Sequence, residues 1–404
     1  MPGSRSCFTL LALALVAPFA SLGDGRAEDA PLRIGVLNDQ SGSTADVTGL
    51  GSVIAARLAI EDFGEKVLGR RIELLSADHQ NKTDIAAAIT RRWIDVENVS
   101  AIVDGGTSAA GLVIQDIVRE KEKIAMFSGP ATSDLTGKAC SPLSFHWTYD
   151  TYALANTLPR AMAKSGVDTW FFITSNYAFG HALERDATTA IERLGGKVLG
   201  RVRHPLGTAD FSSFLLQAQG SGAKIIGLAN SGDDSLNTIK QADEFGIVKG
   251  GQRLGGLLLL INTVHGLGLK ASQGIVIAEA FYWDLDDETR RFSKRFEALA
   301  KKKPNMIQAG VYSAVTHYLK SVQQADTIAG PAVSNTMRSL PVNDFMSKDV
   351  NIRRDGRVMR DMHLFQVKSP SESTGPWDYY QYLSTVRGED VFRPVAESEC
   401  TLLK

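Results

Sequence analysis

The stretch VSAIVDGGTSAAGLVIQDIVREKEKIAMFSG, residues 99–129, decides the fold. Residues 99–106 begin with a short, largely apolar run and end in two glycines. Residues 109–122 repeat apolar side chains at helical spacing. Residues 123–129 form a second apolar run. Continuous apolar runs of this length are typical of strands covered on both faces of a parallel sheet. The stretch therefore predicts a strand, a helix and a second strand of a parallel α/β sheet.

The same alternation continues on both sides of this stretch. Apolar runs that predict strands cover residues 31–38, 70–78, 169–176, 197–205, 223–230, 253–260 and 274–284. Helical periodicity covers residues 51–65, 84–95, 178–195, 210–222, 233–247, 287–303 and 309–325. The pattern stops and restarts around residues 140–152, so the chain divides into two units of similar plan. We therefore expect an α/β fold with two doubly wound parallel-sheet lobes.

The composition limits the function classes that fit this fold. The chain has 404 residues, of which 44% are hydrophobic, so it can bury more than one core. Its 44 basic and 45 acidic residues give a formal net charge of -1. Proteins that bind nucleic acid or anionic lipid through bulk charge need a basic surplus, which this chain lacks. We therefore expect no nucleic-acid partner.

Residues 1–27 predict a secretory signal peptide that is not part of the fold. Arg5 precedes an apolar run, Cys7–Leu22, and the small residue Ala27 follows it. This order is typical of a signal that is cleaved, here after Ala27. The run is short for a membrane span, and Cys7 lies before it rather than at the cleavage point, which argues against a lipid anchor. We expect a soluble periplasmic product.

Two cysteines, Cys140 and Cys400, remain after cleavage. In an exported chain two cysteines favour one disulfide, which here would close a very long loop and fix the C-terminus. Two free thiols are the alternative. The cysteines are far apart in sequence, so their spacing does not indicate a metal site.

Polar residues follow most of the predicted strands, at the point where each strand ends. These groups are Asn38–Thr44, Asp78–Asn81, Gly105–Gly111, Ser128–Ser133, Thr174–Gly180, Ala229–Asp234 and Phe281–Asp284. In open α/β sheets, ligands bind outside the carboxyl ends of the strands. The first four groups belong to one unit and the next two to the other. Two such edges that face each other predict a cleft between the lobes.

The sequence lacks the motifs of several enzyme classes. Around Ser108 it reads GTSAA, which misses the second glycine of a hydrolase nucleophile elbow. The histidines do not have H-E-x-x-H zinc spacing, and neither the G-x-G-x-x-G dinucleotide loop nor the G-x-x-x-x-G-K-[ST] phosphate loop occurs. We therefore expect no enzyme activity, no cofactor and no metal.

The corner GGTSAAG, residues 105–111, offers hydrogen bonds rather than catalysis. Thr107 and Ser108 supply hydroxyls, and the backbone N–H groups of residues 108–110 are free of intrahelical partners at a helix start. Such a corner suits an anionic oxygen, including a carboxylate. A structural interpretation is equally compatible, in which Thr107 or Ser108 only caps the helix.

The chain resembles the type I periplasmic binding proteins, the solute-binding proteins of the branched-chain amino acid family that serve ABC importers. The resemblance covers about residues 31–367. It is carried by PLRIGVLNDQSG, IVDGGTSAAG, KIAMFSGPATSDLT, ITSNYAFG and FSSFLLQAQGSGAKIIGLANSGDDSLNTIKQADEFGI, in this order and spacing. It implies two lobes joined by three crossovers that close on a small molecule by hinge motion. We expect one lobe over residues 31–146 and 284–345, and the other over residues 147–283 and 346–404.

The resemblance also implies which residues bind the ligand. In that family the two segments that match GGTSAAG and SGPAT hold a ligand carboxylate with hydroxyls and backbone amides. The corresponding residues here are Thr107, Ser108, Ala109, Pro130, Ala131 and Thr132. In the second lobe they are Tyr177, Phe179, Asn230 and Ser231. Asp39 and Gln40, at the first strand end, are further candidates.

One position departs from the family pattern. Amino acid binders of the family place an acidic residue after the strand predicted at 253–260, to pair with the ligand's ammonium group. Here that region reads GGLLLLINTVHG and has no carboxylate, although Asp233 or Asp234 could substitute if they do not merely start the next helix. An unpaired ammonium in a closed cleft is unfavourable. We therefore hypothesise a carboxylate-bearing ligand; the missing acidic partner favours an aromatic or other organic acid, and an amino acid is the alternative.

Aromatic residues lie at two of the predicted crossovers. Tyr282 and Trp283 offer flat apolar surface to such a ligand, and hinge packing is the alternative. The segment SFHWTYDTY, residues 144–152, leaves the same two possibilities open.

The expected function is solute capture for membrane permease subunits of an ABC importer, by a protein that acts as a monomer. A periplasmic sensor module that works with a separate signalling partner is the alternative. A permease gene beside this one would favour transport, and a histidine kinase gene would favour sensing.

Overall fold

The computed structural model describes residue 3, residues 30–163, residue 166 and residues 168–404. Except for Gly3, the predicted signal peptide lies outside the described residues. Among the described residues, no helix is long and apolar enough to cross a membrane.

The first sheet has six strands in the order β2-β3-β1-β4-β5-β6. Its strands are β1 (Leu32–Asn38), β2 (Lys66–Val67), β3 (Arg70–Asp78), β4 (Val99–Asp104), β5 (Ile124–Phe127) and β6 (Ser144–His146). All neighbours are parallel except β2 and β3. The strands β1, β4 and β5 are almost wholly buried, as their continuous apolar runs predict. Each carboxyl end points to the same edge, which collects the predicted polar groups.

Helices from two distant parts of the chain cover this sheet. They are α1 (Gly49–Phe63), α2 (Thr83–Asp95), α3 (Ser108–Glu120), α10 (Asp287–Ala300), α11 (Met306–Ala325) and α12 (Gly330–Ser339). Helix α11 packs against α1 and contacts β4 and β5, so it is buried along most of its length. The late segment thus completes the core of the first lobe.

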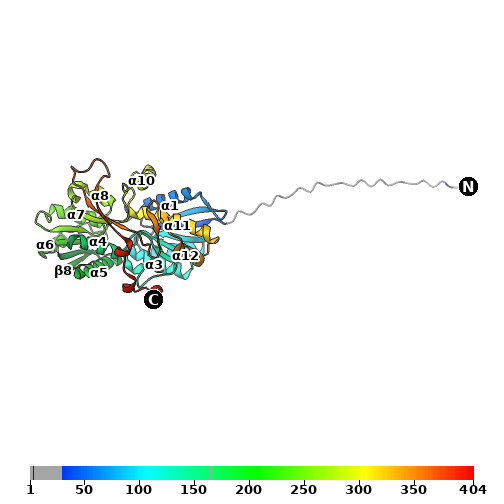
Figure 1. Cartoon of the computed structure of the whole chain (residues 1–404), viewed down its shortest axis with the longest axis horizontal. Coiled ribbons are helices and arrows are strands. Elements are labelled where there is room, and N and C mark those ends of the chain that lie inside the picture. Colours follow the sequence, from blue (N-terminus) through cyan, green and yellow to red (C-terminus); the bar gives the residue numbers. More distant parts are fainter. Residues whose placement is uncertain (1–2, 4–29, 164–165, 167) are drawn as a thin grey trace.

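The second sheet is fully parallel, with the strand order β10-β9-β7-β8. Its strands are β7 (Thr169–Ser175), β8 (Lys197–His204), β9 (Ile225–Ala229) and β10 (Arg253–Gly256). Its helices are α4 (Thr151–Ala163), α5 (Ala178–Arg193), α6 (Ser212–Gly220), α7 (Asp233–Glu244), α8 (Ile261–Leu267) and α9 (Leu269–Ser272). Figure 1 shows α5, α6 and α7 on one side of the molecule and α1, α3 and α11 on the other, so the predicted two-lobed α/β fold is confirmed.

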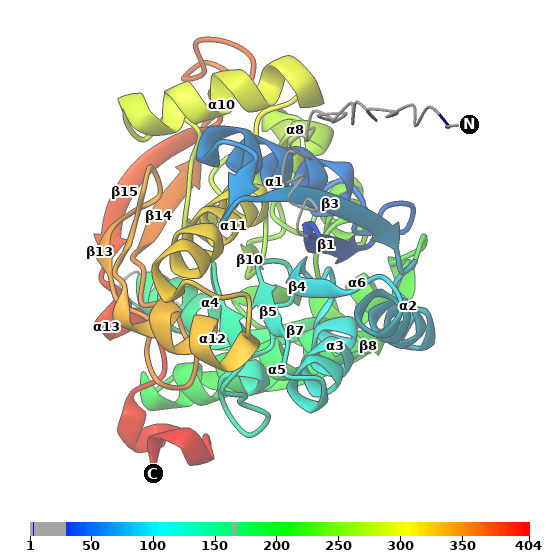
Figure 2. The ribbon, with the colours of Figure 1, turned by 90° about the vertical axis from the view of Figure 1, so that its right-hand side faces the viewer.

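A third, antiparallel sheet joins the last strands to the second lobe. It consists of β11 (Val276–Glu279), β14 (Met362–Val367) and β15 (Tyr380–Val386), in that order. A hairpin, β12 (Val342–Asp344) and β13 (Ser347–Val350), precedes it, and the short helix α13 (Gly388–Val391) follows it. Figure 2 shows β13, β14 and β15 along one flank of the molecule.

The structure corrects two predicted elements. The strand expected over residues 253–260 ends at Gly256, and residues 261–267, for which no helix was predicted, form α8. The four leucines after Gly256 are all buried at the start of this helix, and a short apolar run does not distinguish a strand from a buried helix entrance. The strand expected over residues 274–284 forms only at Val276–Glu279.

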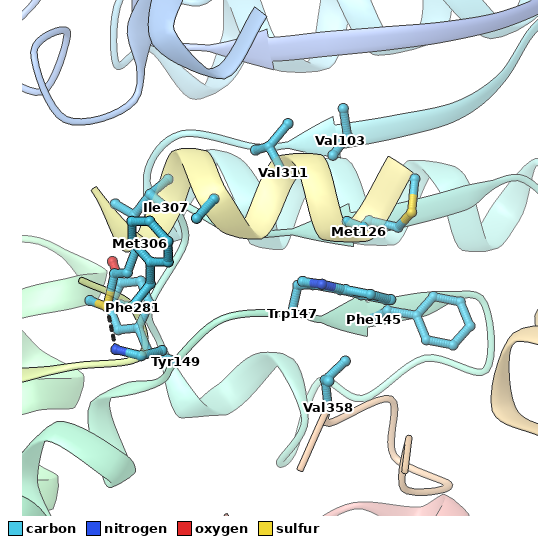
Figure 3. Close-up of a cluster of buried hydrophobic side chains, with 14 of the residues drawn as sticks. Val103, Met126, Phe145, Trp147, Tyr149, Phe281, Met306, Ile307, Val311 and Val358 are labelled. Carbon is cyan, nitrogen blue, oxygen red and sulfur yellow. Dashed lines mark hydrogen bonds between the residues drawn. The ribbon is translucent and has the colours of Figure 1, made fainter. Parts of the chain in front are cut away.

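The chain passes between the lobes three times, and one apolar cluster lies where it does so. Phe145, Trp147 and Tyr149 come from the first passage, Phe281 from the second and Val358 from the third. Figure 3 shows Phe281 and Tyr149 beside Met306 at the start of α11, and Trp147, Phe145 and Val358 further along the helix. Trp147 is held further by its indole N–H, which donates to Ser313 at 2.9 Å. The three passages therefore share one core; the lobe boundaries given above remain a prediction.

Candidate functional site

A cavity lies between the carboxyl edges of the two parallel sheets. The first lobe contributes Thr44, Val47, Thr48, Gly106, Thr107, Ser108, Gly129, Ala131 and Ile307. The second lobe and the first passage contribute Tyr149, Tyr177, Phe179, Ser231, Gly232, Leu258, Leu260 and Thr263. The lobes touch beside it, because the backbone N–H of Asp233 donates to the carbonyl of Ser43 at 3.3 Å. The site is thus a closed interlobe cleft.

Six of the predicted ligand residues line this cavity: Thr107, Ser108, Ala131, Tyr177, Phe179 and Ser231. They come from the loops after β4, β5, β7 and β9, which are separate in sequence but meet because parallel strands end at a common edge. The remaining predicted residues do not line it: Ala109, Pro130, Thr132, Asn230, Asp39, Gln40, Tyr282 and Trp283.

The corner before α3 depends on left-handed backbone. Asp104, Gly105 and Gly106 have φ values of 79°, 81° and 63°. Only glycine adopts this region at little cost, so the paired glycines allow the chain to turn directly from strand into helix. A Cβ on Gly106 would lie 2.4 Å from Nε2 of His79, so this residue has no room for a side chain.

Ser108 joins this corner to the loop after β5. Its hydroxyl oxygen accepts hydrogen bonds from the backbone N–H groups of Ala131 and Thr132, each at 3.1 Å. Thr107 occupies the N-cap position of α3, but its side chain makes no capping hydrogen bond. The Thr107 hydroxyl, which lines the cavity, is therefore not used as a helix cap.

The second lobe supplies an aromatic wall. The rings of Tyr177 and Phe179 lie 5.8 Å apart, between their centroids, at the start of α5. Burial raises the pKa of the Tyr177 hydroxyl, although a hydrogen bond with Ser231 opposes the shift, so this hydroxyl stays protonated. The two rings, tilted by 42° to each other, offer an apolar aromatic surface with one polar group at its edge.

Some residues that line the cavity were not predicted from the sequence, and one was given two alternative roles. Tyr149 lies in the segment 144–152, for which crossover packing was preferred over a place in the cleft wall; it lines the cavity, and its hydroxyl donates to the Gly129 carbonyl at 2.9 Å. Leu258, Leu260 and Thr263 line it at the position where an acidic residue was sought. The apolar run GGLLLLINT contains these residues. The junction between β10 and α8, which turns their side chains toward the cavity, was not predicted.

The predicted residues outside the cavity support nearby loops. The carboxylate of Asp39 accepts from the backbone of Gly42 and Thr44, and the Gln40 amide donates to Asn38 and Ser76. Thr132 caps a short 3-10 turn that begins at Ser133. Ala109 directly follows the lining residue Ser108, and Pro130 lies between the lining residues Gly129 and Ala131.

Asn230 and the Tyr282–Trp283 pair also have structural partners. Asn230 is fully buried and is bonded to Ser235 and Thr238 on α7. The hydroxyl of Tyr282 and the indole N–H of Trp283 both donate to the carbonyl of Trp377. These contacts match the hinge-packing alternative for the aromatic pair.

Helix N-termini converge on the cavity. The N-cap residues of α1, α3, α5 and α7, which are Thr48, Thr107, Tyr177 and Gly232, all line it. Each N-terminus carries partial positive charge and N–H groups without intrahelical partners. Among the described residues, no charged side chain lines the cavity. These N-termini therefore favour an anion in the cavity, against the buried carboxyl groups of Asp39 and Asp234, which act on the lining residue Tyr177 with the opposite sign.

Several buried carboxyl groups lie behind the lining, namely Asp39, Asp104, Asp234 and Glu279, and the pKa values of Asp104 and Glu279 are strongly raised for a clear cause. Burial raises the pKa of Asp104 to about 6, and the hydrogen bond from Asn38 at 2.8 Å opposes this shift. Burial raises the pKa of Glu279 to about 8, against a hydrogen bond from the Tyr380 hydroxyl at 2.8 Å. Both groups bind a proton more readily than usual, so they oppose an anion in the cleft less than two ordinary carboxylates would.

Comparison with known proteins agrees with this architecture. The family described as periplasmic binding protein matches residues 31–375. A periplasmic binding protein from Burkholderia mallei is 45% identical, with a TM-score of 0.90 over 93% of this chain and 99% of that one. A branched-chain amino acid ABC transporter periplasmic ligand-binding protein from Burkholderia xenovorans is 38% identical, with a TM-score of 0.83 over 92% of this chain and 100% of that one.

A curated relative is more distant. Leu/Ile/Val-binding protein homolog 6 of Brucella melitensis is 24% identical over 246 residues, 60% of this chain and 62% of that protein, so the match spans less than two thirds of the relative. The family match, by contrast, covers most of the chain. The protein therefore belongs to the periplasmic binding protein family, within the type I group that includes the substrate-binding proteins of branched-chain amino acid ABC transporters.

Proposed function

We propose that this protein is the periplasmic solute-binding component of an ABC importer and that it captures a small organic acid in the interlobe cleft. One observation carries the proposal: the N-termini of α1, α3, α5 and α7 face a cavity that is lined by hydroxyls, aromatic rings and aliphatic side chains, with no charged side chain among the described residues of its lining. Such a site stabilises a carboxylate through backbone N–H groups and hydroxyls.

The same lining disfavours a zwitterionic amino acid. An α-ammonium group that enters a closed cleft loses its hydration and needs a carboxylate partner. Leu258, Leu260 and Thr263 occupy the wall where such a partner would stand. The ring pair of Tyr177 and Phe179 suits an apolar or aromatic body instead. The ligand proposed is a carboxylate attached to an uncharged, apolar or aromatic group.

Solute capture of this kind requires no bond chemistry. The protein would close on its ligand, dock on membrane permease subunits and release the ligand there. The similarity to the B. xenovorans transporter component supports the role in transport.

Native mass spectrometry of protein purified from its host tests the proposal. We expect a co-purified organic acid, and a thermal-shift screen should rank aromatic and aliphatic monocarboxylates above amino acids. Tight binding of leucine without any response to simple acids would contradict the proposed ligand class.

A further inference from the structure

We propose that residues 387–404, called here the strap, fasten the second lobe to the first and limit how far the cleft opens. The strap follows β15 of the antiparallel sheet, and its helix α13 packs on α4 of the second lobe. It then ends on the first lobe. Figure 1 shows this C-terminal segment, in red, at the junction of the two lobes. The strap is thus a fourth connection in addition to the three passages of the chain.

The attachment to the first lobe is covalent. Cys400 forms a disulfide with Cys140, and their Cα atoms are 5.6 Å apart. Cys140 lies in the loop between β5 and β6, and the Gln115 side chain of α3 donates to the carbonyl of Ala139 in that loop at 2.6 Å. Cys400 is fully buried. This end of the strap therefore moves with the first lobe.

The strap is attached to the second lobe by an ion pair and by contacts with an aromatic side chain. The Glu397 carboxylate lies 2.9 Å from the Arg193 guanidinium on α5 and accepts a hydrogen bond from Tyr152 on α4 at 3.3 Å. The Arg393 guanidinium lies 5.0 Å from the centre of the Tyr152 ring. Because Arg193 and Glu397 are partly exposed, each contact is weak alone. Together they hold the strap on the second lobe.

Between its two ends the strap covers a buried network that crosses the lobes. The Ser133 hydroxyl, from the first lobe, donates to the Asp186 carboxylate of α5 at 2.7 Å. Thr151 donates to the same oxygen at 2.6 Å. Arg393 reaches both partners, with its guanidinium 3.3 Å from Ser133 and 3.3 Å from Asp186. Opening the lobes at this point would expose these groups and separate Arg393 from one of them.

The restraint depends on both attachments, because they act in series. From Glu397 to Cys400 the chain can span only about 10 Å when extended, so two fixed ends keep α5 close to the first lobe. If Glu397 is released, Arg393 still holds the strap on the second lobe, so the tether runs from Arg393 to Cys400, and about seven residues could span roughly 24 Å. If the disulfide is removed, the strap no longer reaches the first lobe covalently. Loss of either attachment therefore frees the lobes, and loss of both adds little.

Small-angle X-ray scattering of the ligand-free protein tests this. We expect a larger radius of gyration for Glu397→Ala and for Cys140→Ser with Cys400→Ser, and no further increase when all three changes are combined. Glu389→Ala is the matched control, since Glu389 lies in the same strap and its ion pair is with Arg387 of the strap itself. This variant should keep the wild-type radius.

An unchanged radius in Glu397→Ala, or increases that add up in the combined variant, would overturn the proposal. If the double cysteine variant does not fold, Glu397→Ala decides alone. The inference rests on the proposed function only in that a solute-binding protein must open to admit its ligand. Because the measurement uses no ligand, a wrong ligand class would leave its outcome unchanged.

Discussion

The hydroxyl oxygen of Ser108 lies 3.1 Å from the backbone nitrogen of Thr132 and so joins the N-terminus of α3 to the loop after β5. The N–H of Ala131 donates to the same oxygen. One side chain thereby sets the distance between the two segments that form the first-lobe half of the cleft.

Replacing Ser108 by alanine should weaken both the fold and the site. Two buried N–H groups would lose their acceptor, which costs about 1–3 kcal/mol of unfolding free energy, and the displaced loop should bind ligand less well. Urea unfolding measures the first effect. Ser144→Ala is the control, because the Ser144 hydroxyl is buried without a hydrogen-bond partner. Equal stability of the two variants would argue against a joining role for Ser108.

The substitution Gly129→Ala should push the same two segments apart, because the methyl group added to one would clash with the other. A Cβ at this position would lie 2.6 Å from Oδ1 of Asp104 and 2.6 Å from the carbonyl oxygen of Gly106. We expect a loss of about 1–3 kcal/mol in unfolding free energy, together with reduced ligand affinity. Gly220→Ala should show neither effect, since nothing lies within 4 Å of its Cβ position. A Gly129 variant with wild-type stability would show that the loops are not tightly packed.

Glu279→Gln should change how stability depends on pH. The pKa of Glu279 is about 8 in the folded protein against an ordinary value of 4.5. Between these values the folded state holds more protons than the unfolded state, so the wild-type unfolding free energy falls as pH rises, by up to about 1.4 kcal/mol per pH unit from this group. The glutamine variant lacks this contribution. Urea unfolding at pH 5 and pH 8 should therefore show a steeper decline for wild type, and parallel declines would contradict the raised pKa.

Leu260→Asp should shift the ligand preference of the cleft. Leu260 lines the cavity and is the N-cap residue of α8, where aspartate is a favoured residue, so the helix should tolerate the change. A carboxylate there repels a simple organic acid and can pair with an ammonium group. We expect affinity for the acid to fall by about 10- to 100-fold and binding of amino acids to appear. Leu260→Asn, which adds polarity without charge, should not gain amino acid binding.

The α/β plan could be predicted from the sequence because continuous apolar runs alternate with helical periodicity. The strand expected over residues 70–78 has the same bounds in the structure, and β7 differs by one residue from its expected range. The helix α4 was missed, because it begins within the aromatic segment 144–152, where the apolar pattern is mixed. The hairpin β12–β13 is short and only partly buried, so it has little apolar pattern to detect.

The site could be predicted where the ligand residues directly follow strands. Parallel strands end at one edge, which brings together the groups that contain Thr107, Ser108, Tyr177 and Ser231, and the family resemblance singled out these four residues within them. Tyr149 and Leu260 depend on how the chain turns after a strand, which local periodicity does not encode. Asn230 was expected to face the ligand, yet its side chain turns toward α7. Side-chain direction at a strand end depends on its tertiary partners rather than on its position in sequence.

The most direct test of the central claim is isothermal titration with matched ligand pairs that differ only in the α-ammonium group. Leucine is compared with 4-methylpentanoate, and phenylalanine with 3-phenylpropanoate. An uncharged cavity at helix N-termini predicts that the deaminated acid binds at least about 10-fold more tightly in each pair, because it brings no ammonium group to be desolvated. Tighter binding of either amino acid than of its deaminated partner would contradict the account.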